Sequence, residues 1–575
     1  MPGNRFPEDV QAEHNILSYY TYHELTSSLH QIVQNHPQLA HIESLGKSFE
    51  GRDLWLVTVT NYESGPANEK PAYWIDGNTH ADEVMGSTVA LYTLWYLLTN
   101  YEHNPSVTRL LDRSVFYILP RISVDGAEHF LTTPGSLRSS KRPYPDSNKL
   151  REGLQVEDID GDGNILTMRI KDPNGAWKCS AKDPRVMRRR EIDEEDGEYY
   201  HLLPEGHLYN YDEFFLPIAQ ETYGIDFNRN YPFEWAPEGT QQGAGTYPLS
   251  EPETRAEVEF WHTHPNISAF LTYHTAGGIV LRPYSTRPDT TVPLHDLEVF
   301  NRMGERATQI TGYPCFSTYH DFRESREEIT HGGMDDYVYD TFGWFGFTVE
   351  LWDMLAAANI TGQHPLLWQQ QHPEEDDIKL MKWNDEGMNG EVFQEWKAFN
   401  HPQLGQIEIG GWKTKFSVRN APPRYLREIC LKMVRLTLSH ASLLPYLRFH
   451  TVKVTSVRQT LFRVIAVVEN AGFLPTYTSR KALENNAVEE VNVSLSLPED
   501  VYVLAGKQHQ KIGHIEGRSN KLRSEFNHHH SPTDNRRKVE WVLEGMPGTP
   551  IDIIVRSPRA GTLHHTFTLP DTKGA

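Results

Sequence analysis

The chain of 575 residues is too long for one ordinary domain, so we expect two or three. Hydrophobic residues make up 38% and aromatic residues 11%, which is enough apolar material for packed cores and excludes wholesale disorder. The net charge of −22 argues against a nucleic-acid partner, because the phosphate backbone requires clustered lysine and arginine. Cys179, Cys315 and Cys430 are far apart, so neither a disulfide framework nor a paired-cysteine zinc site is expected.

The beginning of the chain lacks the apolar core of a secretory signal, and no apolar run reaches membrane-spanning length. We therefore expect a cytoplasmic protein with no membrane partner. The alternative is a secreted protein whose signal has been removed.

Helices and buried strands alternate through the first part of the chain, a pattern that is typical of an α/β domain. The expected elements, in chain order, are a helix and then a strand within 17–61, a strand at 71–76, a helix at 86–99, and strands at 114–119, 267–273 and 346–351. A long helix is expected at about 424–442.

Residues 141–222 interrupt this alternation and are rich in Asp, Glu, Arg and Pro, so we interpret them as an insertion. Within the insertion, Asp158, Asp160 and Asp162 have the spacing of a calcium-binding loop, although Arg169 stands where the bidentate glutamate is expected. A calcium site and a solvated acidic turn are both open.

After residue 444 the pattern changes to short strands with alternating polar and apolar residues, as at 491–497. Further strands are expected at 460–468, 539–543 and 551–555. We predict a catalytic domain at 1–444 and a β-sandwich of immunoglobulin-like or transthyretin-like type at 445–575. The run His528-His529-His530 is interpreted as part of a loop rather than as a metal site.

A possible set of metal ligands lies at the ends of two predicted strands. His80 and Glu83 follow the strand at 71–76, and His274 ends the strand at 267–273. Imidazole and carboxylate groups suit zinc, and catalytic zinc sites usually take three protein ligands and a water. A His-x-x-Glu pair alone is weak evidence, because most such pairs lie on helix surfaces. The third ligand at a strand end strengthens the prediction of a zinc site.

Other chemically useful groups lie near further strand ends. Glu350 lies at the end of a buried strand, where a carboxylate beside zinc-activated water can act as a general base. The segment Asp226-Phe-Asn228-Arg229 combines an acid, an amide and a guanidinium. Arginine matches a carboxylate with two parallel hydrogen bonds.

From about residue 20 to residue 353, the chain resembles the zinc metallocarboxypeptidases of the carboxypeptidase A and B type. The motifs that carry the resemblance occur in the family order: Gly51-Arg52, His80-x-x-Glu83, Val124-Asp125-Gly126, Asp226-Phe-Asn228-Arg229-Asn230, Ser250-Glu-Pro-Glu-Thr254, His274, Gly332-Gly333 and Thr348-Val-Glu350. The resemblance implies a mixed central sheet flanked by helices, one Zn²⁺ per chain, and hydrolysis of the C-terminal bond of a peptide or protein.

The resemblance also implies roles for individual residues. Zinc would be held by His80, Glu83 and His274, and Glu350 would be the base. Asp226 would orient His80.

The remaining roles concern the substrate. Asn228 and Arg229 would hold the terminal carboxylate. Arg138, or Arg142 if the loop is shifted, would polarise the scissile carbonyl. Asp335 would lie at the floor of the pocket for the terminal side chain and favour lysine or arginine there. The alternative is that Asp335 is an acid at the start of a helix.

The sequence also departs from the family pattern. Ser123-Val124 replaces Asn-Pro, and Asp82 stands where digestive members carry an arginine. The position of the tyrosine that covers the substrate is Glu328, and Tyr319 is the nearest tyrosine upstream. Two other functions therefore stay open: a zinc amidase or deacylase acting on acyl-amino acids or muropeptides, and an inactive binding protein.

Overall fold

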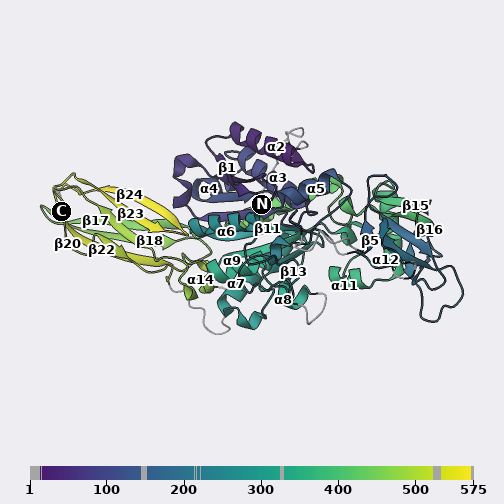
Figure 1. Ribbon diagram of the computed structural model, residues 1–575. Coiled ribbons are helices and arrows are strands. Elements are labelled where there is room, and N and C mark those ends of the chain that lie inside the picture. Colours follow the sequence, from purple (N-terminus) through teal and green to yellow (C-terminus); the bar gives the residue numbers. More distant parts are fainter. Residues whose placement is uncertain are drawn as a thin grey trace.

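The computed structural model describes residues 13, 16–143, 152–212, 214, 216–219, 222–323, 329–521 and 533–571. The protein has a central α/β unit with an accessory β-sheet at one end and a β-sandwich at the other (Figure 1). Within the described ranges, no helix is both long and apolar enough to cross a bilayer. The three cysteines are free thiols.

An eight-stranded mixed sheet forms the centre of the α/β unit, with the strand order β1-β2-β4-β3-β11-β14-β12-β13. Its strands are β1 (Ala40–Lys47), β2 (Asp53–Val59), β3 (Ala72–Gly77), β4 (Val115–Leu119), β11 (Ile267–Thr275), β12 (Ile279–Arg282), β13 (Cys315–Ser317) and β14 (Phe345–Leu351). The neighbours β4, β3, β11 and β14 are parallel, whereas the β2–β4 and β12–β14 pairs are antiparallel. The predicted mixed α/β fold is confirmed.

Helices and two apolar cores enclose this sheet. The larger helices are α2 (Tyr22–Asn35), α3 (Met85–Thr99), α4 (Pro105–Arg113), α5 (Val124–Thr132), α6 (Pro252–Thr263), α7 (Leu294–Thr311), α9 (Met334–Phe342) and α13 (Leu426–Ala441). Helix α3 is buried along almost its whole length, between the sheet and α13. Such a helix is apolar on every side. In β3, Tyr73 and Ile75 enter one core and Trp74 enters the other, as the alternation of a strand requires.

The carboxyl ends of β3, β11 and β14 meet at one edge of the sheet. In the register of these strands, Tyr273 of β11 is paired with Gly77 of β3, and His274 is paired with Glu350 of β14. Open α/β sheets bind ligands at this edge. The topology therefore gathers the predicted site residues that follow these three strands.

The predicted insertion forms a sheet with a segment that lies much later in the chain. The accessory sheet has the order β15-β16-β6-β9-β7-β8. Its strands are β6 (Thr167–Lys171), β7 (Trp177–Cys179), β8 (Met187–Arg189), β9 (Tyr200–Pro204), β15 (Phe393–His401) and β16 (Gly405–Trp412). Leu166 and Met168 share a small core with Ile407 and Ile409. The strands β5 (Gly153–Val156) and β10 (Gly206–Tyr209) form a separate ribbon.

The C-terminal part is a sandwich of two four-stranded antiparallel sheets, β17-β18-β22-β20 and β21-β19-β23-β24. The strands are β17 (Leu447–Arg458), β18 (Leu461–Asn470), β19 (Asn492–Ser496), β20 (Tyr502–Ala505), β21 (His509–Lys511), β22 (Arg536–Glu544), β23 (Pro550–Ser557) and β24 (Gly561–Thr568). Alternate residues of β22 and β23 are buried in the common core. The predicted sandwich is confirmed, and the run His528-His529-His530 lies outside the described residues.

The sandwich is fixed to the α/β unit by buried polar contacts. The guanidinium of Arg559, which is 1% exposed, donates to the carbonyl oxygens of Phe342 and Tyr477. Burial lowers the pKa of Arg559 to about 9. The hydroxyl of Ser479 donates to the carbonyl oxygen of Gly343 at 2.7 Å. These contacts meet the C-terminal end of α9, whose N-terminal end carries Asp335.

Candidate metal centre and active site

One loop and one strand bring the predicted zinc ligands to the edge of the central sheet. His80 and Glu83 lie in the loop between β3 and α3, and His274 is the last residue but one of β11. Gly77 packs so closely on the start of α3 that a Cβ atom there would lie 2.7 Å from the backbone of Gly86. Glycine at this position therefore allows the loop to turn directly over the helix.

The side chains of His80, Glu83 and His274 converge on one point. Nδ1 of His80 lies 2.9 Å from Oε1 of Glu83 and 3.1 Å from Nδ1 of His274, which in turn lies 3.0 Å from Oε2 of Glu83. All three residues are buried, and their ligand atoms lie within 4.8 Å of one another. The structure brings together the three residues that the sequence predicts as ligands.

Asp226 determines which nitrogen of His80 faces the other two groups. Oδ1 of Asp226 lies 3.2 Å from Nε2 of His80. Because an ionised carboxylate can only accept, Nε2 carries the proton and Nδ1 directs its lone pair toward Glu83 and His274. Two imidazoles and a carboxylate, with a second carboxylate behind one imidazole, are a donor set that fits zinc.

Two guanidinium groups keep Asp226 ionised. Nε of Arg138 donates to Oδ2 of Asp226 at 2.7 Å, and Nη1 of Arg229 lies 3.9 Å from the same oxygen. Burial alone would raise the pKa of Asp226, but the charges of Arg138, Arg229 and His80 hold this pKa well below its usual range. Asp226 is therefore a permanent acceptor for His80.

We expect Asp226→Asn to weaken zinc binding about 10- to 100-fold, because the amide holds the proton on Nε2 of His80 less firmly. Competition for zinc with a chromophoric chelator measures the change. Asp500→Asn, at an exposed turn of the sandwich, is the matched control and should leave the affinity unaltered. Equal affinities for the Asp226 variant and the parent protein would show that Asp226 does not orient His80.

Glu350 lies in β14 directly opposite His274 and is 8% exposed. It lines the same cavity as His80 and Glu83. Burial, followed by the charge of Glu83, raises the pKa of Glu350 to about 7. A carboxyl group whose pKa lies near neutrality can both accept and return a proton.

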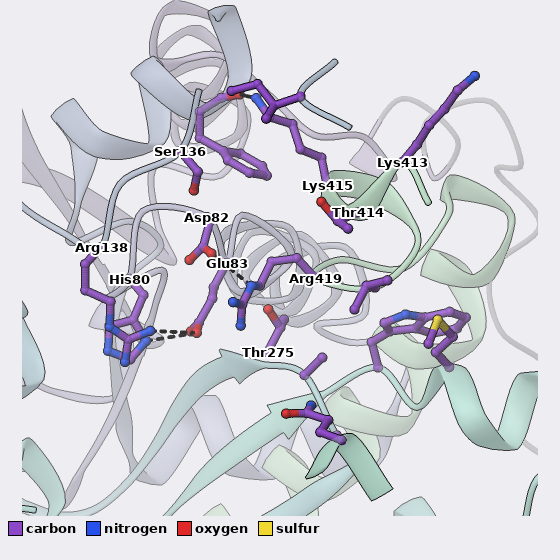
Figure 2. A pocket seen from close by; sticks show the side chains of 18 of the residues that line it. His80, Asp82, Glu83, Ser136, Arg138, Thr275, Lys413, Thr414, Lys415 and Arg419 are labelled. Carbon is purple, nitrogen blue, oxygen red and sulfur yellow. Dashed lines mark hydrogen bonds and ion pairs between the residues drawn. The ribbon is translucent and has the colours of Figure 1, made fainter. Parts of the chain in front are cut away.

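The two candidate arginines have different surroundings. Arg138 lines the cavity, and its Nη1 lies 3.9 Å from Oε1 of Glu83 (Figure 2). Arg142 instead pairs with Glu251 at 3.1 Å and stacks on the ring of Phe49. The structure therefore places Arg138, rather than Arg142, beside the metal ligands.

The tyrosine expected to cover the substrate is not found at Tyr319, although another tyrosine, Tyr223, lines the cavity. Tyr319 lies in the short helix α8 (Thr318–Asp321), where the guanidinium of Arg323 stacks on its ring. Tyr319 is not among the described residues that line the cavity, and Glu328 lies outside the described residues.

The residues predicted to bind the substrate gather at the start of α9. Oδ1 of Asn228 accepts a hydrogen bond from the backbone N–H of Met334 at 2.8 Å. A Cβ atom on Gly333 would lie 3.2 Å from Oδ1 of Asp335 and 3.8 Å from Oδ1 of Asn228. Asp335 is buried, which raises its pKa, and Oδ1 accepts from the next backbone N–H at 3.0 Å. Asn228 and Asp335 are not among the described residues that line the cavity.

The predicted calcium loop brings only part of its acid set together. Asp158 and Asp160 lie close to Glu205, which comes from the turn before β10. Oδ1 of Asp162 is engaged by the backbone N–H of Asn164. The carboxylate of Asp158 likewise accepts the backbone N–H groups of Gly161 and Gly163. The carboxylate of Glu205 accepts those of Ile159, Asp160 and Leu166. The carboxylates of the loop thus accept hydrogen bonds from the backbone of the same loop. Calcium binding at this loop stays a prediction.

A cavity of about 980 Å³ lies over the metal ligands. Its walls come from the central unit, from residues of the insertion such as Gln155 and Ile165, and from the segment 413–420 that follows β16. No local pattern predicts a role for this last segment. The one related signal is Asp82, a departure from the family pattern, because Asp82 pairs with Arg419. Asn78 was also missed: in the left-handed region (φ 60°), it donates to the carbonyl oxygen of His80.

Comparisons with known proteins agree with this geometry. The zinc carboxypeptidase family matches residues 25–364, and a domain of unknown function (DUF8731) matches residues 446–568. Carboxypeptidase A6 of Homo sapiens is 23% identical over 279 residues, which are 47% of this chain and 46% of that protein. A zinc carboxypeptidase of Saccharothrix mutabilis subsp. capreolus is 32% identical over 124 residues, 22% of this chain and 28% of that protein.

Among solved structures, the crystal structure of thrombin activatable fibrinolysis inhibitor is similar, with a TM-score of 0.42, 18% identity and coverage of 74% of each chain. The match spans about half the length of the human and mouse carboxypeptidase A6 sequences. The family match covers more than half of this chain and contains all the residues of the candidate metal centre. The chain belongs to the zinc carboxypeptidase family.

Proposed function

We propose that this protein is a zinc-dependent metallocarboxypeptidase that hydrolyses the C-terminal bond of a peptide or protein. The observation that carries the proposal is the pairing of Glu350 with His274 in neighbouring strands, beside the buried cluster of His80, Glu83 and His274. A carboxyl group of near-neutral pKa thus lines the same cavity as groups able to hold zinc. Membership of the zinc carboxypeptidase family supports the same reaction.

The residues divide the chemistry between them. His80, Glu83 and His274 would hold the zinc, which when bound would supply Lewis acidity to a carbonyl group and to water. Glu350 takes the proton of the attacking water and passes it to the departing amine. Arg138 donates to the carbonyl oxygen as negative charge develops there. Asn228 and Arg229 bind the terminal carboxylate of the substrate.

The size of the cavity is consistent with an end of a chain as the substrate. A volume of about 980 Å³ is at the upper end for pockets that enclose small ligands, and it accommodates a few residues of extended peptide. The insertion and the segment 413–420 both contribute to its walls, which gives an extended peptide further surface to contact. The substrate is therefore the extended end of a peptide or protein.

The test uses the zinc-loaded protein and a library of peptides that differ in the terminal residue, with mass spectrometry of the products. We expect release of a single C-terminal amino acid and no cleavage of peptides with an amidated terminus. N-acyl amino acids serve as comparison substrates. Cleavage of N-acyl amino acids alone, or of no substrate at full zinc occupancy, would contradict the proposal.

The charge of Asp335 predicts the preferred terminal side chain. We infer that the terminal side chain of the substrate reaches Asp335, a buried carboxyl group at the start of α9, which would favour a terminal arginine or lysine and disfavour phenylalanine or glutamate. We expect Asp335→Ile to lower kcat/KM for a terminal arginine about 10- to 100-fold relative to phenylalanine, since it removes a carboxylate partner for the charge. Asp335→Asn, which keeps the shape, should shift the ratio in the same direction. A parent protein that prefers phenylalanine would show that Asp335 is not the selector.

A further inference from the structure

The segment 413–420 forms one wall of the cavity but lies outside the residues that match the zinc carboxypeptidase family. It contributes Lys413, Thr414, Lys415, Val418 and Arg419 to the lining. In Figure 2 the labelled residues of this segment lie on the opposite side of Glu83 from Arg138 and His80. This wall of the cavity is therefore supplied by a part of the chain outside the family match, whereas the residues of the candidate metal centre lie inside it.

Buried hydrogen bonds fix this segment against the loop that carries the metal ligands. Oδ1 of Asn420, a fully buried residue, accepts from the backbone N–H of Met85 at 3.0 Å, and its Nδ2 donates to the carbonyl oxygen of Asp82 at 2.7 Å. Nε1 of Trp352 donates to the carbonyl oxygen of Ser417 at 2.7 Å. The wall is thus held in a defined position relative to His80 and Glu83, as a subsite requires.

Arg419 is the cation of this segment whose charge reaches the candidate active site. Its Nε lies 2.9 Å from Oδ2 of Asp82, and its side chain is 44% exposed. The head group is directed toward Glu83 (Figure 2). Its charge also acts on Glu350, since it is one of those that lower the pKa of that residue. Asp82 thus orients Arg419 through Nε. The two Nη atoms of the planar guanidinium are left to face the cavity.

The two lysines of the segment add positive charge farther from the metal ligands. The amino group of Lys415 donates to the carbonyl oxygens of Phe130 and Thr133, both at 2.6 Å, and the charge of Asp82 also acts on it. Burial lowers the pKa of Lys415 to about 8. Lys413 is partly exposed, and its amino group has no hydrogen bond or ion pair with any residue in the described ranges.

Acidic groups on the same wall do not cancel these charges. Asp82 is engaged by Arg419, and Oδ1 of Asp353 accepts the backbone N–H of Ala356 at the start of the short helix α10 (Met354–Ala357). The segment thus carries three cations against these two carboxylates, and the other carboxyl groups of the cavity, Glu83 and Glu350, belong to the candidate metal centre and its base. A wall of this kind attracts an anionic group of the substrate and repels a cationic one.

We propose that Arg419 and Lys413 form a subsite for carboxylate side chains on the amino-terminal side of the scissile bond, so that the preferred substrates are peptides with acidic residues before the terminal residue. This inference rests on the proposed carboxypeptidase function. In that function Arg229 and Asn228 hold the terminal carboxylate, and the preceding residues extend past Glu83 along the opposite wall. Arg419 then meets the penultimate side chain, and Lys413 meets a residue farther from the terminus.

The test compares peptides that share one terminal residue and carry glutamate or glutamine at the penultimate position or two residues farther upstream. For the zinc-loaded protein we expect kcat/KM to be roughly tenfold higher with a penultimate glutamate than with glutamine. Arg419→Gln should abolish this ratio and Arg419→Lys should restore part of it. Lys413→Gln should reduce only the preference at the upstream position. Lys453→Gln, an exposed lysine of the sandwich, is the matched control and should change neither ratio.

Binding to the Glu350→Gln protein gives a second readout that does not require turnover. Fluorescence anisotropy of labelled peptides should show the same preference for glutamate, and this preference should weaken as the salt concentration rises. Cleavage with equal rates for glutamate and glutamine peptides would overturn the subsite and leave the proposed function standing. Preferred binding of the glutamate peptide without cleavage of any peptide would overturn the proposed function and leave the subsite standing. Equal binding of both peptides would overturn the subsite in either case.

Discussion

Glu350→Gln is expected to keep zinc bound and to lose about 10²- to 10⁴-fold in kcat. The substitution removes the group that accepts the proton of the attacking water, yet it leaves His80, Glu83 and His274 in place. Glutamine has almost the same volume, so β14 and its pairing with β11 should be retained. Single-turnover kinetics and metal analysis of the same sample measure the two effects separately.

An exposed glutamate supplies the control for this experiment. Glu391→Gln lies in the turn before β15, away from the described wall of the cavity, and should leave kcat at the parent value. Turnover by Glu350→Gln at the parent rate would show that another group activates the water. Loss of zinc from that variant would mean that Glu350 is a ligand rather than a base.

His274→Ala is expected to lose both zinc and activity, because two remaining protein ligands rarely hold a catalytic ion. A ligand that binds only the folded state stabilises it by RT ln(1 + [L]/Kd), or about 2.7 kcal/mol at 100 times Kd. Zinc should therefore raise the melting temperature of the parent protein by several degrees and leave that of the variant unchanged. Calorimetry with and without added zinc measures this difference.

His564→Ala, at an exposed position of β24, is the matched control and should retain the shift that zinc produces. A full equivalent of zinc in His274→Ala would place the third ligand elsewhere. A parent protein whose melting temperature does not respond to zinc would argue against a zinc site at this cluster.

The metal centre could be predicted from the sequence because its residues lie at the ends of strands that the sequence also reveals. Short, continuous apolar runs mark β3, β11 and β14, which are buried along their whole length, and parallel strands direct their carboxyl ends to one edge. Once these strands are neighbours, His80, His274 and Glu350 must lie close together. The β-sandwich was predictable for a similar reason, since strands such as β22 and β23 alternate along their whole length.

The accessory sheet and the segment 413–420 could not be predicted in this way. Strand β6 has only five residues, and its partner β16 lies much later in the chain, so no local periodicity reveals the pairing. Arg419 and Asn420 carry no motif, and their contact with Asp82 exists only after the sheet has formed. Asp82 was noted as a departure from the family pattern, but nothing nearby in the sequence identifies its partner.

The position of β6 between β9 and β16 has a consequence for how the chain is made. A ribosome releases β6 long before β16, so the nascent insertion carries a strand with an unpaired edge while the central sheet is being completed. His274 and Glu350 emerge before residues 405–412 do. A chain whose synthesis stops between residues 351 and 405 therefore contains every zinc ligand and the base but lacks one wall of its cavity.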